Sequence, residues 1–203
     1  MASDPIVHVV DDDDAVRKSV SFLLMAEGFN VRQHESAMTF LKMTNIDGGC
    51  IVTDVRMPEI SGIEFIRLLK ERGLSLPVIV MTGHADISLA VEAMKAGAVD
   101  FLEKPFEDQR FLDIVRSALE LREHNVQQAA ELQSIRTRLD ALSMRERQVV
   151  DCLIAGKANK VIAHDLSISP RTVEIYRANV MTKMEAKSLS ELVRMVLVAE
   201  RSM

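Results

Sequence analysis

The first 122 residues alternate between short apolar runs and segments with helical spacing. Four of the runs are almost wholly apolar and a fifth is weaker; they span 6–10, 50–53, 78–81, 99–102 and, weakest, 29–33. Unbroken apolar runs of this length are typical of strands buried in a parallel sheet. Between the runs, apolar side chains recur at helical spacing in residues 14–27, 36–45, 61–72, 86–95 and 107–122. This alternation predicts an α/β fold with a doubly wound, five-stranded parallel sheet.

Polar side chains gather where the apolar runs end. Asp11 and Asp12 follow the run at 6–10, and Asp54 follows the run at 50–53. Thr82 follows the run at 78–81, and Lys104 lies just beyond the run at 99–102. Ligands of such folds bind at the carboxyl ends of the strands, so we expect these five side chains to converge. Carboxylates packed together resist ionisation unless a cation joins them, and Mg²⁺ prefers oxygen ligands. A single residue of this set is most simply a loop residue, but the whole set indicates a functional site.

The same edge of the sheet has the groups that phosphoryl transfer needs. A carboxylate can act as a nucleophile and form an aspartyl-phosphate, and Asp54 on the central run is best placed for this role. Lys104 and Thr82 can hold the remaining phosphate oxygens. The rival interpretation is a phosphohydrolase, since such enzymes also use an aspartyl nucleophile. They usually place it after the first strand, however, and no substrate cap is evident in this sequence.

Residues 1–122 resemble the receiver domain of two-component response regulators. The resemblance rests on V-V-D-D at 9–12, D-V-R-M-P-E-I-S-G at 54–62, M-T-G at 81–83 and F-L-E-K-P-F at 101–106. It implies a flavodoxin-like fold with Asp54 as the phosphoacceptor. It further implies Mg²⁺ or Mn²⁺ held by Asp11, Asp12, Asp54 and the backbone carbonyl of Arg56. Such a domain is not an enzyme, apart from Mg²⁺-dependent self-phosphorylation and slow autodephosphorylation.

The receiver resemblance also implies a switch. Thr82 is the hydroxyl expected to move toward the phosphoryl group, Lys104 is the cation that pairs with it, and Phe101 takes the place of the aromatic switch residue. The Lys104–Pro105 bond is expected to be cis. Arg56 and His84, each two residues beyond a site residue, are expected to tune the phosphoryl lifetime.

Residues 142–203 have the signals of four short helices. The predicted helix starts are a capping box from Ser143 to Glu146, Asn159 before 160–166, Ser169-Pro170 before 170–184, and Ser188 before 189–200. Gly156 ends the first of these helices. The short connection at 167–169 fits a helix-turn-helix.

The third of these helices has an inner and an outer face. At about 100° per residue, Val173, Val180 and Met184 face inward. The residues expected to contact DNA are Lys160, Arg171, Thr172, Glu174, Ile175, Arg177 and Ala178. Apolar Ile175 and Ala178 suit thymine methyls, and Glu174 can accept from cytosine N4. On this pattern alone, an ordinary four-helix bundle with a merely solvated outer face is an equal alternative. A separate rival is a protein-interaction module whose helix-turn-helix never contacts DNA.

The resemblance of residues 142–198 to the LuxR-type helix-turn-helix favours DNA binding. It rests on L-S-M-R-E at 142–146, G-K-A-N-K-V-I-A at 156–163, L-S-I-S at 166–169 and T-V-E-I-Y-R at 172–177. Many relatives have Lys in place of Glu174, so their site preference is not transferred. Together the two halves resemble the nitrogen-fixation regulators of rhizobia. This implies an activator whose partners are an oxygen-responsive sensor histidine kinase, double-stranded DNA and RNA polymerase, and which forms a homodimer when phosphorylated.

Residues 123–141 are expected to form a helical linker between domains at 1–122 and 142–203. Residues 107–141 contain no Gly or Pro, and apolar side chains recur there near 3.5-residue spacing with a polar gap at 123–128. Two alternatives compete: a coiled-coil dimer seam, and an amphipathic helix folded onto its own domains. The polar gap favours a loosely held linker.

The balance of charged residues differs between the first 122 residues and the rest of the chain. Residues 1–122 have 13 Lys and Arg against 20 Asp and Glu, whereas residues 123–203 have 12 against 10. An acidic half joined to a mildly basic half suggests two functions. No apolar run approaches the roughly 18–20 residues of a membrane span, and no signal peptide is evident, which predicts a cytoplasmic protein without membrane contact. Cys50 and Cys152 are expected to be free thiols.

Overall fold

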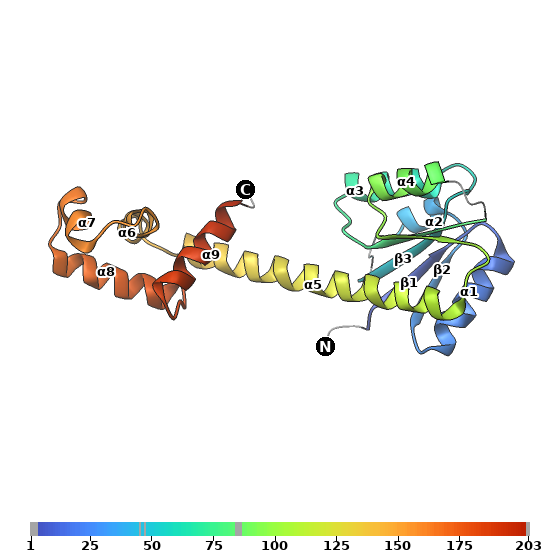
Figure 1. Cartoon of the computed structure of the whole chain (residues 1–203), viewed down its shortest axis with the longest axis horizontal. Helices are drawn as coiled ribbons and strands as arrows, with labels where there is room; N and C mark the ends of the chain where they lie inside the picture. Colours follow the sequence, from blue (N-terminus) through green and yellow to red (C-terminus); the bar gives the residue numbers. More distant parts are fainter. Residues whose placement is uncertain (1–3, 45, 47, 84–86, 202–203) are drawn as a thin grey trace. The chain divides into compact units, whose positions relative to one another are not determined.

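The computed structural model describes residues 4–44, 46, 48–83 and 87–201 (Figure 1). The chain divides into two compact units, Met1–Asn125 and Val126–Met203. The boundary falls inside one long helix, so the linker expected at 123–141 is shared between the units. His84 lies outside the described residues.

A five-stranded parallel sheet organises the first unit. Its strands are β1 (Ile6–Val10), β2 (Asn30–His34), β3 (Gly49–Asp54), β4 (Val78–Thr82) and β5 (Asp100–Glu103). They lie in the order β2-β1-β3-β4-β5, and every pairing is parallel. The predicted doubly wound sheet is confirmed, and β3 is its central strand.

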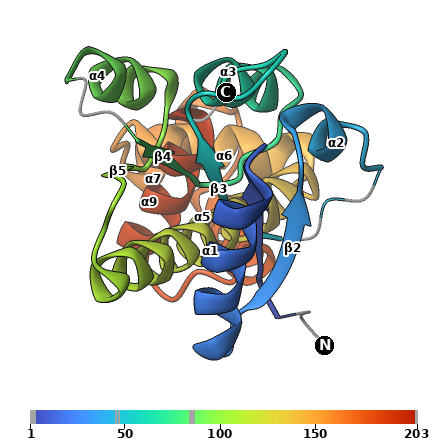
Figure 2. The same ribbon diagram turned by 90° about the vertical axis from the view of Figure 1, so that its right-hand side faces the viewer.

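Helices cover both faces of this sheet (Figure 2). One face is covered by α2 (Ala37–Leu41), α3 (Gly62–Glu71) and α4 (Ile87–Ala96), and the other by α1 (Asp14–Ala26) and the first part of α5 (Asp108–Asp140). Phe40 and Phe65 are fully buried in the first layer, and Leu24 and Phe111 in the second. Because both faces are buried, the inner strands β3 and β4 are mostly apolar, as the sequence indicated, whereas the edge strand β2 is largely polar and exposed.

Polar contacts, one of them between residues far apart in the sequence, define two helix ends that periodicity alone places poorly. Helix α2 ends at Leu41, four residues before the end expected at 45, and Arg72 donates to the Leu41 carbonyl at 2.6 Å. This bond satisfies a carbonyl that further helix would otherwise use. At α1, Asp13 is the N-cap and accepts from the backbone amides of Ala15 and Val16. Asp14 is the first residue of the helix, so both acids lie at its positive end, where the helix dipole favours them.

The second unit is all helical. It contains α6 (Met144–Ile154), α7 (Asn159–Asp165), α8 (Pro170–Lys183) and α9 (Leu189–Arg201). The capping box at Ser143 and Glu146 is present, and Ser169 and Ser188 accept from backbone amides at the starts of α8 and α9. The expectation that Asn159 caps α7 is wrong: the N-cap is Ala158, with no side-chain cap. The Asn159 side chain instead accepts a hydrogen bond from Arg177.

Helix α5 belongs to both units. Phe111, Val115 and Ala118 are buried in the core of the first unit, whereas Ile135 and Leu139 are buried in the core of the second. These side chains are therefore unavailable for a coiled-coil seam. The contacts match the alternative of an amphipathic helix folded onto its own domains. Between the two buried sets, residues 123–130 are exposed.

The remaining whole-chain features agree with the sequence analysis. Cys50 and Cys152 are free thiols, and burial raises the pKa of Cys50 to about 12. Among the described residues, no helix is long and apolar enough to cross a membrane.

Two histidines pack together beneath α2. His8 Nδ1 and His34 Nε2 lie 3.1 Å apart, and the ring of Phe40 contacts both imidazoles edge-on. Both side chains are buried. Burial, followed by the nearby charges of His8 and Arg32, lowers the pKa of His34 to about 4. His34 is thus held neutral in the folded chain.

This lowered pKa predicts acid sensitivity of the first unit. The neutral form is favoured by folding, so its contribution is full above the unfolded pKa of 6.5 and is lost as the pH falls toward 4. Between pH 7.5 and pH 5 we expect a loss of about 2 kcal/mol in the free energy of unfolding. Urea denaturation at the two pH values measures it. The loss should shrink in His34→Gln but persist in His164→Gln, whose histidine is exposed; an equal loss in both variants would contradict this assignment.

Candidate functional site

The carboxyl ends of the parallel strands bring four predicted site residues to one edge of the sheet. Asp54 and Thr82 are the last residues of β3 and β4, and Asp11 and Lys104 directly follow β1 and β5. Asp11 and Thr82 are each 1% exposed and Asp54 is 9% exposed. These three side chains are therefore largely shielded from solvent at the ends of the central strands.

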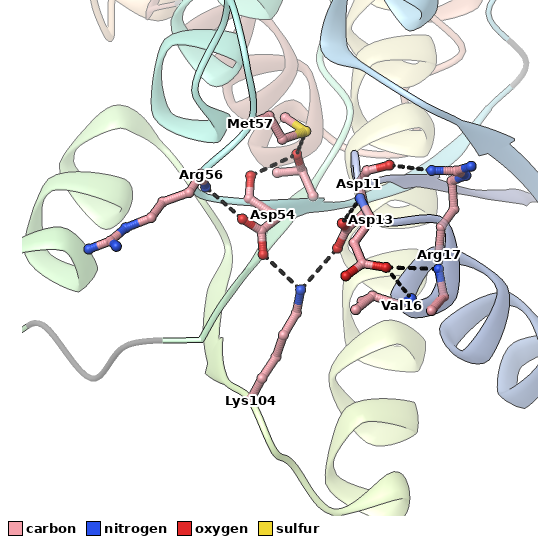
Figure 3. A network of polar contacts seen from close by, with 10 residues as sticks. Asp11, Asp13, Val16, Arg17, Asp54, Arg56, Met57 and Lys104 are labelled. Carbon is pink, nitrogen blue, oxygen red and sulfur yellow. Dashed lines mark hydrogen bonds and ion pairs between the residues drawn. The ribbon is translucent and has the colours of Figure 1, made fainter.

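Lys104 links the two buried carboxylates (Figure 3). Its Nζ lies 2.9 Å from Asp11 Oδ2 and 2.7 Å from Asp54 Oδ1. The other carboxylate oxygens accept from backbone amides: Asp54 Oδ2 from Arg56 N at 2.6 Å, and Asp11 Oδ1 from Asp13 N at 2.9 Å. Each carboxylate is thus fixed at both oxygens, which holds Asp54 in one orientation.

Burial and charge act in opposite directions on these groups. Burial raises the pKa of Asp11 above its ordinary value, although Lys104 opposes the shift. For Lys104, burial lowers the pKa, but the hydrogen bonds and charges of Asp54 and Asp11 outweigh it and the net pKa is raised. The ammonium thus stays charged at neutral pH and stabilises the ionised carboxylates.

The other predicted residues of the receiver site surround this cluster. Asp12 is exposed and lines a groove beside Asp54 together with Arg56, Ser61 and Glu64. The Arg56 side chain points away from Asp54, toward solvent (Figure 3). Phe101 is half-buried against the core beneath α4. The Lys104–Pro105 bond is cis, as expected.

The chemistry of these residues fits a hard divalent cation. Asp11, Asp12 and Asp54 offer carboxylate oxygens at one edge of the sheet, and Arg56, whose backbone amide donates to Asp54, has the backbone carbonyl expected to complete the set. Mg²⁺ prefers such oxygen ligands and keeps several waters. In the described part of the chain, no three His, Cys, Asp or Glu side chains are arranged as a ready metal site. The Lys104 ammonium bridges the two buried carboxylates instead.

Two residues that sequence reasoning did not assign support the cluster. Arg17 on α1 donates to the Asp11 carbonyl at 2.7 Å and fixes the start of that loop. Gly62 begins α3 where a Cβ would lie 2.2 Å from the Asp54 carbonyl oxygen, so only glycine permits this approach. Gly62 is the last residue of the D-V-R-M-P-E-I-S-G motif at 54–62, so the sequence contains a signal for it. Arg17 lies in no such motif.

Most of the residues expected to contact DNA lie on the exposed surface of α8 and α7. Val173, Val180 and Met184 are buried, as predicted. Arg171, Glu174, Ile175 and Ala178 are exposed, as is Lys160 on α7. Thr172 is half-buried, with its Oγ1 2.8 Å from Ser169 Oγ. Arg177 is also half-buried and donates to Asn159 on α7, so its guanidinium joins the two helices of the turn.

Further side chains fix α8 within the unit. Glu146 is buried and accepts from Lys183 Nζ at 2.7 Å, which ties the start of α6 to the end of α8. Arg138 on α5 donates to the Met184 carbonyl at 3.1 Å and pairs with Glu185. Cations at the last turn favour the negative end of the helix dipole. The capping-box motif predicted the role of Glu146 at the start of α6. No neighbouring residue in the sequence indicated its ion pair with Lys183.

Comparisons with known proteins match a different family to each of the two units. The family described as response regulator receiver domain matches residues 7–116, and the family described as bacterial regulatory proteins, luxR family, matches residues 140–196. The transcriptional regulatory protein FixJ of Azorhizobium caulinodans is 58% identical over 95% of this chain and 92% of that protein. Full-length FixJ from B. japonicum shares 50% identity with a TM-score of 0.61, covering 97% of this chain and 98% of that chain. The response regulator StyR shares 39% identity with a TM-score of 0.83, covering 96% and 98%.

Proposed function

The chain belongs to the response regulators of two-component systems and has a LuxR-type DNA-binding domain, and from this we propose that phosphorylation of Asp54 converts it into a DNA-binding dimer that activates transcription. The observation that carries the proposal is the fixed carboxylate of Asp54 beside Lys104 and Thr82 at the end of the central strands. The family is one of regulators and not of catalytic enzymes.

In the proposed step, the receiver accepts a phosphoryl group from a histidine kinase. An Asp54 carboxylate oxygen attacks the phosphorus of the kinase phosphohistidine, the new O–P bond forms, and the N–P bond breaks with its electrons returning to the imidazole. Lys104, already 2.7 Å from Asp54, neutralises a phosphoryl oxygen, and the Thr82 hydroxyl holds another. Small phosphodonors would phosphorylate Asp54 by the same step. Slow attack of water on the phosphorus would break the new O–P bond, restore the Asp54 carboxylate and release inorganic phosphate.

Receiver domains generally bind Mg²⁺ at the phosphorylation site. Asp11, Asp12, Asp54 and the Arg56 carbonyl are the residues that would hold Mg²⁺ or Mn²⁺ here. The ion supplies positive charge that offsets the charge of the phosphoryl oxygens. Lys104 would then be released from Asp11 and left to pair with the phosphoryl group.

The surface of α4 supports dimerisation on the face formed by α4, β5 and α5. Ile87, Val91 and Met94 recur at helical spacing on α4 and are 83%, 47% and 48% exposed. Thr82 ends β4 and Phe101 lies on β5, so both adjoin this face. A shift of the two side chains toward the phosphoryl group would reshape the surface that a second copy contacts. Two α8 helices in one dimer would then contact two half-sites.

The partners follow from the family and from the relatives. A receiver implies a sensor kinase, and a LuxR-type domain implies binding to double-stranded DNA. The relatives named FixJ favour a FixL-like oxygen-responsive kinase and nitrogen-fixation promoters, where an activator would contact RNA polymerase. Such a protein would work in the cytoplasm.

Intact-mass measurement with acetyl phosphate and Mg²⁺ tests the phosphoacceptor. Wild type and Asp113→Asn, whose carboxylate is exposed on α5, should gain one phosphoryl group, whereas Asp54→Asn should gain none. A gel shift on a nitrogen-fixation promoter fragment, before and after phosphorylation, tests the output. Phosphorylation of Asp54→Asn to the wild-type extent would contradict the assignment. A gel shift that stays negative after phosphorylation would favour the protein-interaction alternative.

A further inference from the structure

The outward face of α8 contains one amide side chain, Asn179, that the DNA-facing set above does not include. Asn179 is exposed and lies one helical turn beyond Ile175, whose side chain is 54% exposed. Ala178, beside it, is also exposed and adds only a methyl group. At about 100° per residue, Asn179 is farther from the buried stripe of Val173 and Val180 than from Ile175. Asn179 therefore shares the surface that would enter a DNA groove.

Most other polar side chains of α8 are engaged within the unit. Arg177 donates to Asn159, and Lys183 donates to Glu146 at 2.7 Å. Thr182 Oγ1 donates to the Ala178 carbonyl at 3.0 Å. In the structure as described, the side chains of Arg171, Glu174 and Asn179 make no hydrogen bond or ion pair. Of these three, Asn179 alone has both a donor and an acceptor at the end of a short side chain.

We propose that Asn179 is a specificity-determining residue that recognises an adenine in the major groove. Its Nδ2–H donates to adenine N7, and its Oδ1 accepts from the adenine N6 amino group, a pairing that no other base offers in that groove. Ile175, one turn earlier on the same face, would contact a neighbouring thymine methyl. The small Ala178 allows the helix to approach the base edges closely. This inference rests on the proposed DNA binding and adds to it one base and one contact.

Selection from a random-sequence duplex library by the phosphorylated full chain gives the first test. We expect wild type to select a motif with an adenine whose preference disappears in Asn179→Ala while the other positions of the motif remain. Affinity for the adenine-containing site should fall roughly 5- to 150-fold, the discrimination expected from one bidentate pair. Gln133→Ala, which removes an exposed amide from α5, is the matched control and should keep the whole motif.

A modified base separates a base contact from a structural effect. Replacing the adenine by 7-deazaadenine removes the N7 acceptor, so it should weaken binding of wild type and leave binding of Asn179→Ala unchanged. Equal weakening of both proteins would overturn the inference, as would an unchanged motif in Asn179→Ala or a loss of affinity uniform across sequences. If wild type selects no motif after confirmed phosphorylation, the proposed DNA binding itself fails and this inference fails with it.

Discussion

We expect Lys104→Gln to lower the free energy of unfolding of the first unit by about 3 kcal/mol at pH 7 without Mg²⁺, the cost of removing one partner of a buried charge cluster. The side chains of Asp11 and Asp54 are 2% and 13% exposed, and Lys104 is the cation bonded to both. Without it, the two largely buried carboxyl groups lose the cation that they share. Urea denaturation followed by circular dichroism measures the change.

Two conditions should restore the Lys104→Gln variant. Added Mg²⁺ supplies a cation and should recover part of the lost stability. Acid should do the same: the pKa of Asp11 is already raised by burial and rises further without the ammonium, so protonation relieves the repulsion as the pH falls below 7. Lys42→Gln, at an exposed lysine, serves as control. Equal stability of the two variants at pH 7 would contradict the role given to Lys104.

Glu146→Ala should destabilise the second unit by about 2 kcal/mol, because it removes one half of a capping box, the partner of Lys183 and the packing of a buried side chain. Glu146 is 4% exposed, accepts from the Ser143 amide at 2.7 Å and pairs with Lys183. The hydrogen bond from Lys183 lowers the pKa of Glu146, so the contribution of the ionised form is lost as the pH falls below 4.5. Urea denaturation of the full chain measures this loss of stability as a change in the unfolding of the second unit.

A conservative variant separates the two contacts of Glu146. Glu146→Gln keeps an acceptor for the Ser143 amide and loses only the charge that attracts Lys183, whose side chain is 43% exposed. Its cost should be below about 1 kcal/mol, as for a partly solvated ion pair. Glu131→Ala, at an exposed position of α5, should change little. An effect of Glu146→Gln as large as that of Glu146→Ala would show that the ion pair, and not the cap, dominates.

The receiver fold was predictable because both the strands and the site residues leave local signals. Strands buried on two faces are apolar along their whole length, and the site residues stand where those runs stop, as at Asp54 and Thr82. The end of α2 was not predictable, because Arg72, distant in sequence, bonds to the Leu41 carbonyl. Periodicity finds the buried face of a helix but contains no information on such contacts.

The second unit shows the same limit. Serine caps at Ser143, Ser169 and Ser188 were predicted from adjacent residues and are present. Asn159 has the side chain of a cap but bonds to Arg177, eighteen positions away, which only the packing of α7 on α8 brings close. The linker alternatives were left open for a related reason: an apolar stripe shows that α5 is covered, and only the tertiary structure shows that its own domains cover it.

Sedimentation with and without acetyl phosphate plus Mg²⁺, beside Asp54→Asn, tests the central claim most directly. We predict that wild type changes from monomer to dimer on phosphorylation and that Asp54→Asn remains monomeric under both conditions. A wild-type sample whose phosphorylation is confirmed by mass and which stays monomeric would contradict dimerisation as the switch.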